Sequence, residues 1–357
     1  MRVASQRAVG SDEARFMEAA RSGDAGAFAV LTERYRRELH VHCYRMLASF
    51  EDAQDLTQEV FLRAWSRRAS FEGRSSLRTW LYRIATNACL DFLDRRPNRV
   101  PVPSSTQDGA AAEVAYLQPY PDRLLDEIPA GGDEPGDVVV ARETVELAFL
   151  VAVQHLPARQ RAVLILRDIL GWPASDTAAT LEMSVASANS ALQRARATMR
   201  EQLPDRRLEW SPSRQGLTGQ ERRTLQRYVD AHTKGDIHGL TALLREDLRF
   251  AMPPEPGSWV GRDAVVRMWV DGGFGSASFG EWRCLLTWAN RQPAVAAYLR
   301  RPDDTEFRLA VIDVLRLENG LIAEITAFPS DSCPAFDLPP TLDETTSDTP
   351  STSGTEA

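Results

Sequence analysis

Apolar residues recur at three- and four-residue spacing through the first hundred positions, which is the pattern of amphipathic helices. Residues 11–49 predict two helices, separated by a break at Gly23 and an N-cap at Asp24. Two longer helical patterns follow over residues 51–97 and are joined by a short polar loop. Together these patterns predict an all-α domain over residues 11–97.

The helical periodicity is lost over residues 98–137, where six prolines and many acidic residues predict an extended linker. This segment is too apolar for an inert spacer, so we expect it to dock against something when the protein works. The apolar residues behind this expectation are Tyr116, Leu117, Tyr120, Leu124, Leu125 and Ile128.

Helical spacing returns over residues 138–203 and includes a helix-turn-helix pattern. A short helix over residues 173–180 is followed by a turn, and Ser184 caps a second helix. The residues of the second helix that should face inward are Val185, Ala188, Leu192 and Ala195. Those that should stay exposed are Ser187, Asn189, Ser190, Gln193, Arg194 and Arg196. Such side chains can bond base edges in the major groove, although many helical hairpins share this pattern.

The C-terminal part begins after a second polar linker over residues 204–217, and its pattern changes from helical to alternating. Helices are expected over residues 218–234, 236–244 and 262–271. The expected strands are Leu248–Met252, Glu281–Ala289, Ala294–Arg300, Glu306–Leu317 and Leu321–Ala327. The fourth strand alternates, with one face formed by Phe307, Leu309, Val311, Asp313 and Leu315.

The predicted architecture is therefore multidomain, with two all-α domains followed by an α+β domain over residues 218–337. Residues 338–357 are rich in Pro, Thr, Ser and acidic residues, a composition that predicts a disordered tail.

The formal net charge of −8 is unusual for a protein that binds nucleic acid by itself, because phosphate contacts dominate that affinity. The charge is unevenly distributed. Residues 1–100 carry 17 basic and 13 acidic residues, and residues 151–210 carry 8 and 6. Residues 101–150 carry 2 basic and 10 acidic residues, and residues 211–357 carry 15 and 21. The two helical domains are thus the basic parts of an acidic chain.

Several classes of protein are excluded by what the sequence lacks. No apolar run is long enough to span a membrane, and the N-terminus has no signal-peptide core, so we expect a cytoplasmic protein without membrane contact. The four cysteines form no CxxC pair and the histidines suggest no ligand set. We therefore expect no metal site and no cofactor.

Arginines, an amide and large aromatic residues are interleaved around the apolar stripe of residues 77–96. Arginine suits phosphates, asparagine can bond a base edge, and aromatic rings stack on bases released from a duplex. Trp80 and the loop of residues 67–74 are our candidates for stabilising an opened strand. The alternative is that the aromatics are core residues and the arginines a solvated surface. The candidate DNA-binding residues of this stretch are Arg74, Arg78, Trp80, Tyr82, Arg83, Asn87, Asp91, Arg95 and Arg96.

The stretch from Asp52 to Arg96, followed by the helix-turn-helix, resembles regions 2 and 4 of group 4, or extracytoplasmic-function, bacterial sigma factors. The resemblance implies a promoter-specificity subunit. Its region 2 would bind the β′ clamp helices of core RNA polymerase and read the −10 element through the residues just named. Its region 4 would read the −35 element through the exposed helix-turn-helix residues and contact the β flap. The residues that match the core-binding helix are Asp52, Asp55, Gln58, Glu59, Phe61, Arg63 and Trp65.

In this family the linker between the two regions runs through the channels of the polymerase, which is what the resemblance implies for residues 98–137. The match has one departure. Many family members carry basic residues at the positions of Asn189 and Ala191, so we make no prediction of the −35 sequence.

The C-terminal pattern resembles the SnoaL-like branch of the NTF2-like superfamily, which implies a cone-shaped α+β domain with a cavity that regulates the sigma domains. The candidate cavity residues are Trp269, Trp282, Phe307 and Asp313. For this domain we expect either a small-molecule ligand or an intramolecular contact with the sigma domains.

Two alternatives to a sigma factor remain open at this point. One is a ligand-sensing regulator that binds DNA through its helix-turn-helix alone. The other is an NTF2-like enzyme in which Asp313 is the base. A sigma subunit would have no catalysis of its own, and its partners would be core RNA polymerase and promoter DNA.

Overall fold

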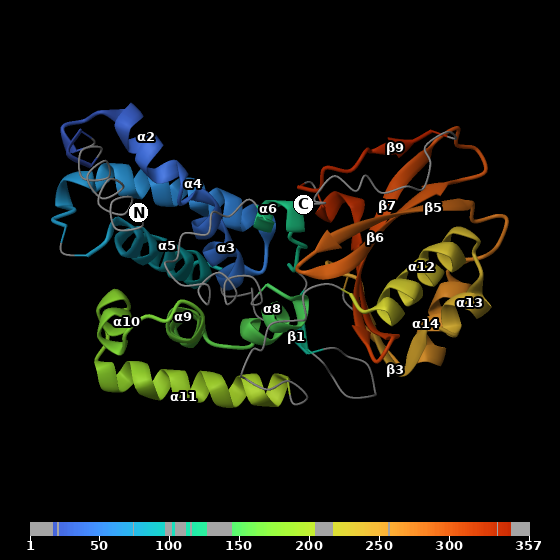
Figure 1. The fold of residues 1–357 in the computed structure, drawn as a ribbon. Helices are drawn as coiled ribbons and strands as arrows, with labels where there is room; N and C mark the ends of the chain where they lie inside the picture. Colours follow the sequence, from blue (N-terminus) through green and yellow to red (C-terminus); the bar gives the residue numbers. More distant parts are fainter. Residues whose placement is uncertain are drawn as a thin grey trace. The chain divides into compact units, whose positions relative to one another are not determined.

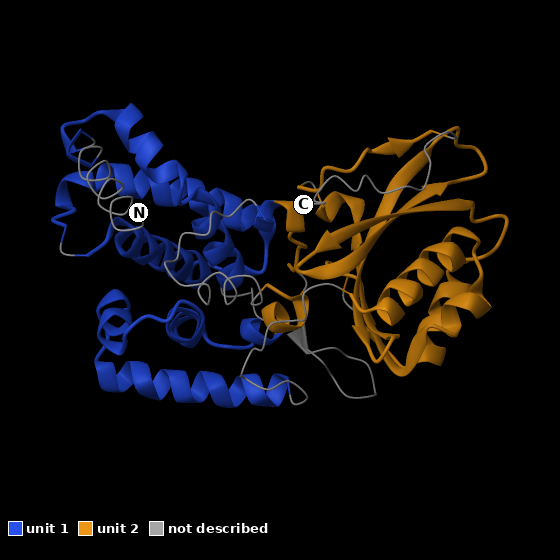
Figure 2. Ribbon diagram, in the orientation of Figure 1, with its two compact units in different colours: residues 1–99, 124–144, 152–209 blue, residues 100–123, 145–151, 210–357 orange. Residues whose placement is uncertain are grey.

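The computed structural model (Figure 1) divides into two compact units, which Figure 2 colours separately. The first comprises residues 1–99, 124–144 and 152–209, and the second comprises residues 100–123, 145–151 and 210–357. The residues that the structure describes are 17–19, 21–73, 75–96, 102–103, 112–114, 116–126, 145–203, 217–255, 258–333 and 335–343.

The N-terminal helices of the first unit are α2 (Ala25–Glu33), α3 (Arg36–Leu47), α4 (Phe50–Ser66) and α5 (Leu77–Asp94), with a 3-10 turn, η1 (Arg68–Ser70), after α4. Side-chain caps fix where these helices begin. Asp24 caps α2, Ser49 caps α4 and Ser76 caps α5. Helix α3 packs against both α4 and α5. The apolar stripes predicted for α4 and α5 form the core between them, and Phe92 at the end of the second stripe is half-buried. The stripe residues confirmed as buried are Ala53, Leu56, Val60, Ala64, Leu77, Leu81, Ile84 and Ala88.

The remaining helices of this half of the chain are α8 (Leu147–Gln154), α9 (Ala158–Leu164), a π-turn η2 (Ile165–Ile169), α10 (Ala174–Thr180) and α11 (Val185–Gln202). Helices α10 and α11 form the predicted helix-turn-helix. The turn passes through Glu182 in a left-handed conformation, and the Ser184 hydroxyl accepts the backbone N–H of Ser187 at 3.0 Å. The prediction that Val185 faces inward is wrong, because 45% of it is exposed. Val185 is the first residue of α11, and the buried residues of this helix begin at Ala188.

The second unit contains a mixed sheet in the order β4-β3-β8-β7-β6-β5. Its strands are β3 (Leu244–Ala251), β4 (Ser258–Val260), β5 (Glu281–Ala289), β6 (Gln292–Arg300), β7 (Phe307–Glu318) and β8 (Leu321–Pro329). Strands β3 and β8 pair in parallel, whereas β4 with β3, β8 with β7, β7 with β6 and β6 with β5 pair antiparallel. The helices α12 (Gly219–Thr233), α13 (Ile237–Thr241) and α14 (Arg262–Asp271) pack on this sheet (Figure 1). The predicted α+β class is correct.

Strand β7 contains a bulge that the alternating pattern did not predict. Ala297 of β6 opposes Val311, but the next residue, Tyr298, opposes Leu309. One extra residue is therefore inserted in β7, and side chains before it point to the opposite face. Phe307 and Leu309 thus do not share the face of Asp313, as the sequence had suggested. The Phe307 ring instead lies between two guanidinium groups, 4.7 Å from that of Arg283 and 4.6 Å from that of Arg300.

The predicted linkers and tail also gain some structure. Two short strands, β1 (Val102–Pro103) and β2 (Ala112–Glu113), pair within residues 98–137, and α6 covers Asp122–Asp126. Residues 338–343 were predicted to be disordered, which is wrong, because β9 (Thr341–Leu342) pairs with β7. Residues 204–216 and 344–357 lie outside the described part of the chain.

Candidate nucleic-acid and polymerase interfaces

Helix α4 presents the predicted polymerase-binding residues as a mixture of exposed and tethered side chains. Asp55 and Gln58 are exposed. Arg63 bridges two carboxylates, at 2.6 Å from Glu59 and 2.7 Å from Asp91 of α5. Leu62, which was not among the predicted core-binding residues, is 70% exposed on this helix. A single exposed leucine is common on protein surfaces, so Leu62 does not by itself mark a binding site.

The remaining α4 residues pack within region 2. Asp52 lies 3.6 Å from Arg96. The Phe61 ring lies 5.0 Å below the guanidinium of Arg36. The Trp65 ring lies 5.2 Å from that of Phe28. Each of these three predicted residues is half-buried, so it also helps to hold α4 in place.

Helix α5 carries the predicted −10 residues on two different surfaces. Arg83 and Arg95 are exposed, and Asn87 is half-buried on the same helix. Asp91 and Arg96 are exposed but tied to α4 by the ion pairs already described. These five residues form a polar strip that is open to a partner. Arg74 lies outside the described residues.

The other three −10 candidates lie toward the N-terminal part of α5, where α3 holds Arg78 and Tyr82 and the loop after η1 packs on Trp80. Arg78 donates to Glu38 at 2.9 Å, and the Trp80 ring lies 5.2 Å from Phe71. Tyr82 departs from the prediction, because only 3% of it is exposed. Its ring packs against His42 and against Trp172 of the helix-turn-helix half.

Glu38 is a site residue that sequence reasoning missed. It binds Arg78, and its carboxylate lies 3.4 Å from the Tyr82 hydroxyl. Burial raises the pKa of Glu38, while the positive charge of Arg78 acts against that rise. Glu38 is 40 residues from Arg78, and no local pattern links two residues so far apart.

Helix α11 presents the predicted −35 residues as an open face. Ser187, Asn189, Ser190, Gln193 and Arg194 are all exposed. This is the arrangement in which a recognition helix enters a major groove.

Two neighbouring positions on α11 differ from that exposed face. Arg196 is tethered, since its Nε and Nη2 donate to the two carboxylate oxygens of Asp168, at 2.9 and 2.8 Å. Ala191 is buried, so a basic side chain at this position would have to leave the core.

Helix α9 joins the two halves of the first unit by packing on α3 and α5. Arg161 of α9 is buried and donates to the backbone oxygen of Met46 at the end of α3. It also donates to the side chain of Gln154 at 2.5 Å and to the Leu156 oxygen at 3.2 Å. With the Tyr82–Trp172 contact, this packing partly covers the helix predicted to read the −10 element.

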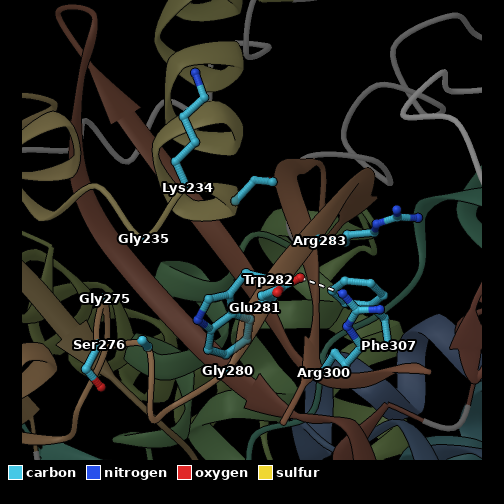
Figure 3. Close-up of a pocket in the computed structure, with 12 residues that line it drawn as sticks. Lys234, Gly235, Gly275, Ser276, Gly280, Glu281, Trp282, Arg283, Arg300 and Phe307 are labelled. Carbon is cyan, nitrogen blue, oxygen red and sulfur yellow. Dashed lines mark hydrogen bonds and ion pairs between the residues drawn. The ribbon is translucent and has the colours of Figure 1, made fainter. Parts of the chain in front are cut away.

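The candidate cavity residues of the second unit do not line one site. A cavity of about 620 Å³ is lined by Trp282 and Phe307, among others, but not by Asp313 or Trp269 (Figure 3). Trp269 packs against Phe250 and Phe274.

Asp313 is 5% exposed and accepts the Tyr228 hydroxyl at 2.9 Å. Burial raises the pKa of Asp313 to about 7 and lowers the pKa of the adjacent His232 to about 4. The His232 Nε2 is 3.9 Å from the Asp313 carboxylate, which is too long for a hydrogen bond. Asp313 is therefore a core acid satisfied by a tyrosine.

The apolar residues of the linker are confirmed as buried or half-buried where the structure describes them. Leu117, Tyr120, Leu124 and Leu125 are buried, and Tyr116 is half-buried. Ile128 lies outside the described residues.

Within the described residues, no three His, Cys, Asp or Glu side chains lie close enough together to hold a metal ion. No helix in the same part of the chain is long and apolar enough to cross a membrane.

Three models of known protein families match separate parts of the chain. Sigma-70 region 2 matches residues 31–98, sigma-70 region 4 matches residues 146–199, and a SnoaL-like domain matches residues 225–325. The ECF RNA polymerase sigma factor SigG of Mycobacterium tuberculosis is 40% identical over 331 residues, which cover 89% of this chain and 85% of SigG. SigW of Bacillus subtilis is 31% identical over 188 residues, which cover 52% of this chain and 93% of SigW.

A solved structure has the same fold over most of the chain. The crystal structure of the M. tuberculosis extracytoplasmic function sigma factor SigJ superposes with a TM-score of 0.54 at 21% identity, covering 84% of this chain and 96% of SigJ. The SigG identity extends through all three matched regions. The chain therefore belongs to the extracytoplasmic-function family of RNA polymerase sigma factors, non-catalytic subunits that act with RNA polymerase at promoter DNA, and carries a C-terminal SnoaL-like domain.

Proposed function

We propose that α4 binds the β′ clamp helices of core polymerase, that α5 reads the −10 element and that α11 reads the −35 element. The observation that carries this assignment is the open face of α11 from Ser187 to Arg194, which is the arrangement of a helix that enters a major groove. Asp55 and Gln58 are exposed on α4, so these two predicted residues are accessible to a partner. The β flap is the proposed contact of region 4.

The net charge of −8 is consistent with a chain that reads promoter DNA only when it is bound to polymerase. A free chain this acidic binds DNA weakly, because the phosphate term dominates affinity. In a holoenzyme the polymerase supplies that nonspecific attraction, and α5 and α11 supply the choice of bases.

The SnoaL-like domain is proposed to regulate this activity through the linker between regions 2 and 4. Residues 100–123 and 145–151 belong to the same compact unit as the SnoaL-like sheet. In the family, this linker enters the channels of the polymerase. A linker packed on the SnoaL-like domain cannot occupy those channels at the same time.

The test is in vitro transcription with bacterial core polymerase over a genomic promoter library, comparing the full chain with residues 1–210. Specific starts with either form support the sigma assignment, and a higher yield from residues 1–210 supports restraint by the SnoaL-like domain. Core binding without any specific start contradicts the promoter assignments. Equal yields from the two forms contradict the regulatory role.

A further inference from the structure

The two-residue turn between β5 and β6 is unusual because it is buried. Ala289 pairs with Gln292, and Asn290 and Arg291 between them are both left-handed, with φ of 56° and 60°. This is the conformation that such a hairpin requires. Hairpin tips normally lie in solvent, yet Asn290 has no exposed surface. Other segments of the second unit must therefore cover the turn.

Two linker segments, which are far apart in sequence, cover it. The side chain of Asn290 accepts the backbone N–H of Tyr120 at 2.8 Å and donates to the backbone oxygen of Val145 at 2.6 Å. The backbone N–H of Asn290 donates to the Tyr120 oxygen at 2.9 Å, next to a strand-like pairing of Pro121 with Ala289. One amide thus holds both the segment that leaves region 2 and the segment that enters region 4.

The next two residues of the turn strengthen the same contact. Arg291 donates its backbone N–H to Asp122 at 2.8 Å, and its guanidinium lies 3.6 Å from the same carboxylate. The side chain of Gln292 accepts the backbone N–H of Leu147 at 3.0 Å. We call Asn290–Gln292 the latch.

The side-chain hydrogen bonds of Asn290 are not needed to form the hairpin turn itself. A left-handed turn position is satisfied by glycine, which has no side chain. Here the asparagine amide uses both its acceptor and its donor on buried linker backbone, where an unpaired group is costly. Because one side chain satisfies both segments, loss of that side chain weakens both attachments together.

We propose that the latch is the regulatory contact, which holds the region 2–region 4 linker on the SnoaL-like domain and releases it when the chain joins core polymerase. This inference rests on the proposed function, because it requires the linker to enter the polymerase. Polymerase binding and linker docking on the latch are then mutually exclusive.

The test compares Asn290→Gly with Asn319→Gly in the full chain. Both asparagines are left-handed residues of two-residue hairpin turns, with φ of 56° and 52°, and glycine keeps either turn. Asn319 is the matched control because it is exposed and lies in the β7–β8 turn, where its backbone oxygen accepts from Gln220. The first readout is hydrogen–deuterium exchange of the linker amides, and the second is transcription with core polymerase.

Asn290→Gly should speed exchange at residues 116–123 and 145–150 by roughly 30-fold, because two hydrogen bonds of ordinary net strength are lost. Asn319→Gly should leave those amides unchanged. Unchanged exchange in Asn290→Gly overturns the latch, whatever transcription does. Faster exchange with a higher transcription yield supports the regulatory proposal. Faster exchange with an unchanged yield shows that the linker is held by the latch but refutes regulation through it.

Discussion

Asp313 provides a quantitative test of how the SnoaL-like domain is built, because its environment opposes ionisation. The carboxyl is buried and its hydrogen-bond partner is the Tyr228 hydroxyl. Burial raises its pKa from the ordinary 3.8 to about 7, with the Tyr228 bond acting in the opposite direction. Asparagine at this position has nearly the same shape, can still accept the Tyr228 hydroxyl, and carries no charge at any pH.

The direction in which stability changes with pH follows from proton binding. Between pH 3.8 and about pH 7 the folded state holds a proton on Asp313 that the unfolded state has lost. Stability therefore falls as pH rises through this window, and it is constant above it. A shift of about three units corresponds to roughly 4 kcal/mol. His232, with a lowered pKa of about 4, has the opposite dependence, in which stability falls as pH drops below its ordinary value of 6.5.

The experiment therefore measures a difference between two chains. Urea unfolding of the second unit, followed by tryptophan fluorescence, is compared for the parent and Asp313→Asn. Between about pH 5 and about pH 8 the stability difference should move by roughly 3 kcal/mol in favour of Asn. His232 is present in both chains, so the difference removes its contribution apart from the coupling to Asp313, whose carboxylate is 3.9 Å away. Asp263→Asn, at an exposed carboxylate of α14, is the matched control and should show little change. A flat difference for Asp313→Asn, or a change of opposite sign, would refute the burial argument.

Three further changes test the first unit. Arg194→Ala should weaken holoenzyme binding to promoter duplex by about 1–3 kcal/mol, whereas Arg196→Ala, at an arginine held by Asp168, should change it far less; a larger effect at Arg196 would contradict the assignment. Arg161→Met should lower the free energy of unfolding, measured in urea, by roughly 3 kcal/mol, because the buried acceptors of Met46, Gln154 and Leu156 lose their hydrogen-bond donor. A loss below about 1 kcal/mol would contradict this role of Arg161. Trp80→Ala should reduce permanganate-reactive open complexes while leaving core affinity intact; a parallel loss of core affinity would point to a structural role.

Features determined by neighbouring residues could be predicted from the sequence. Ser49, Ser76 and Ser184 each bind a backbone N–H three residues ahead, so the position of the hydroxyl identifies the start of the helix. The turn at Asn319–Gly320 was predictable for the same reason, because its left-handed conformation depends on those two residues. The exposed face of α11 followed from helical spacing alone.

Features that depend on distant residues could not be predicted in this way. The burial of Tyr82 requires Trp172, which is 90 positions further along the chain. The tethering of Arg196 requires Asp168, whose pairing no periodicity indicates. The bulge in β7 was missed because alternation describes one strand, whereas register is a property of two paired strands. In these three cases the error concerns a contact partner, while the secondary structure around it was predicted correctly.

The linker combines both kinds of information. Its composition predicted that it docks, because apolar residues such as Tyr120 are costly to leave in water, but only the fold identified the partner as a hairpin turn. Under the latch proposal, the strength of that docking sets the activity of the sigma factor. A latch worth roughly 3 kcal/mol would lower the apparent affinity for polymerase by roughly 150-fold, because only the released fraction of the chain can bind. Polymerase contacts of ordinary size can exceed that cost, so the latch would restrain the sigma factor without preventing it from acting.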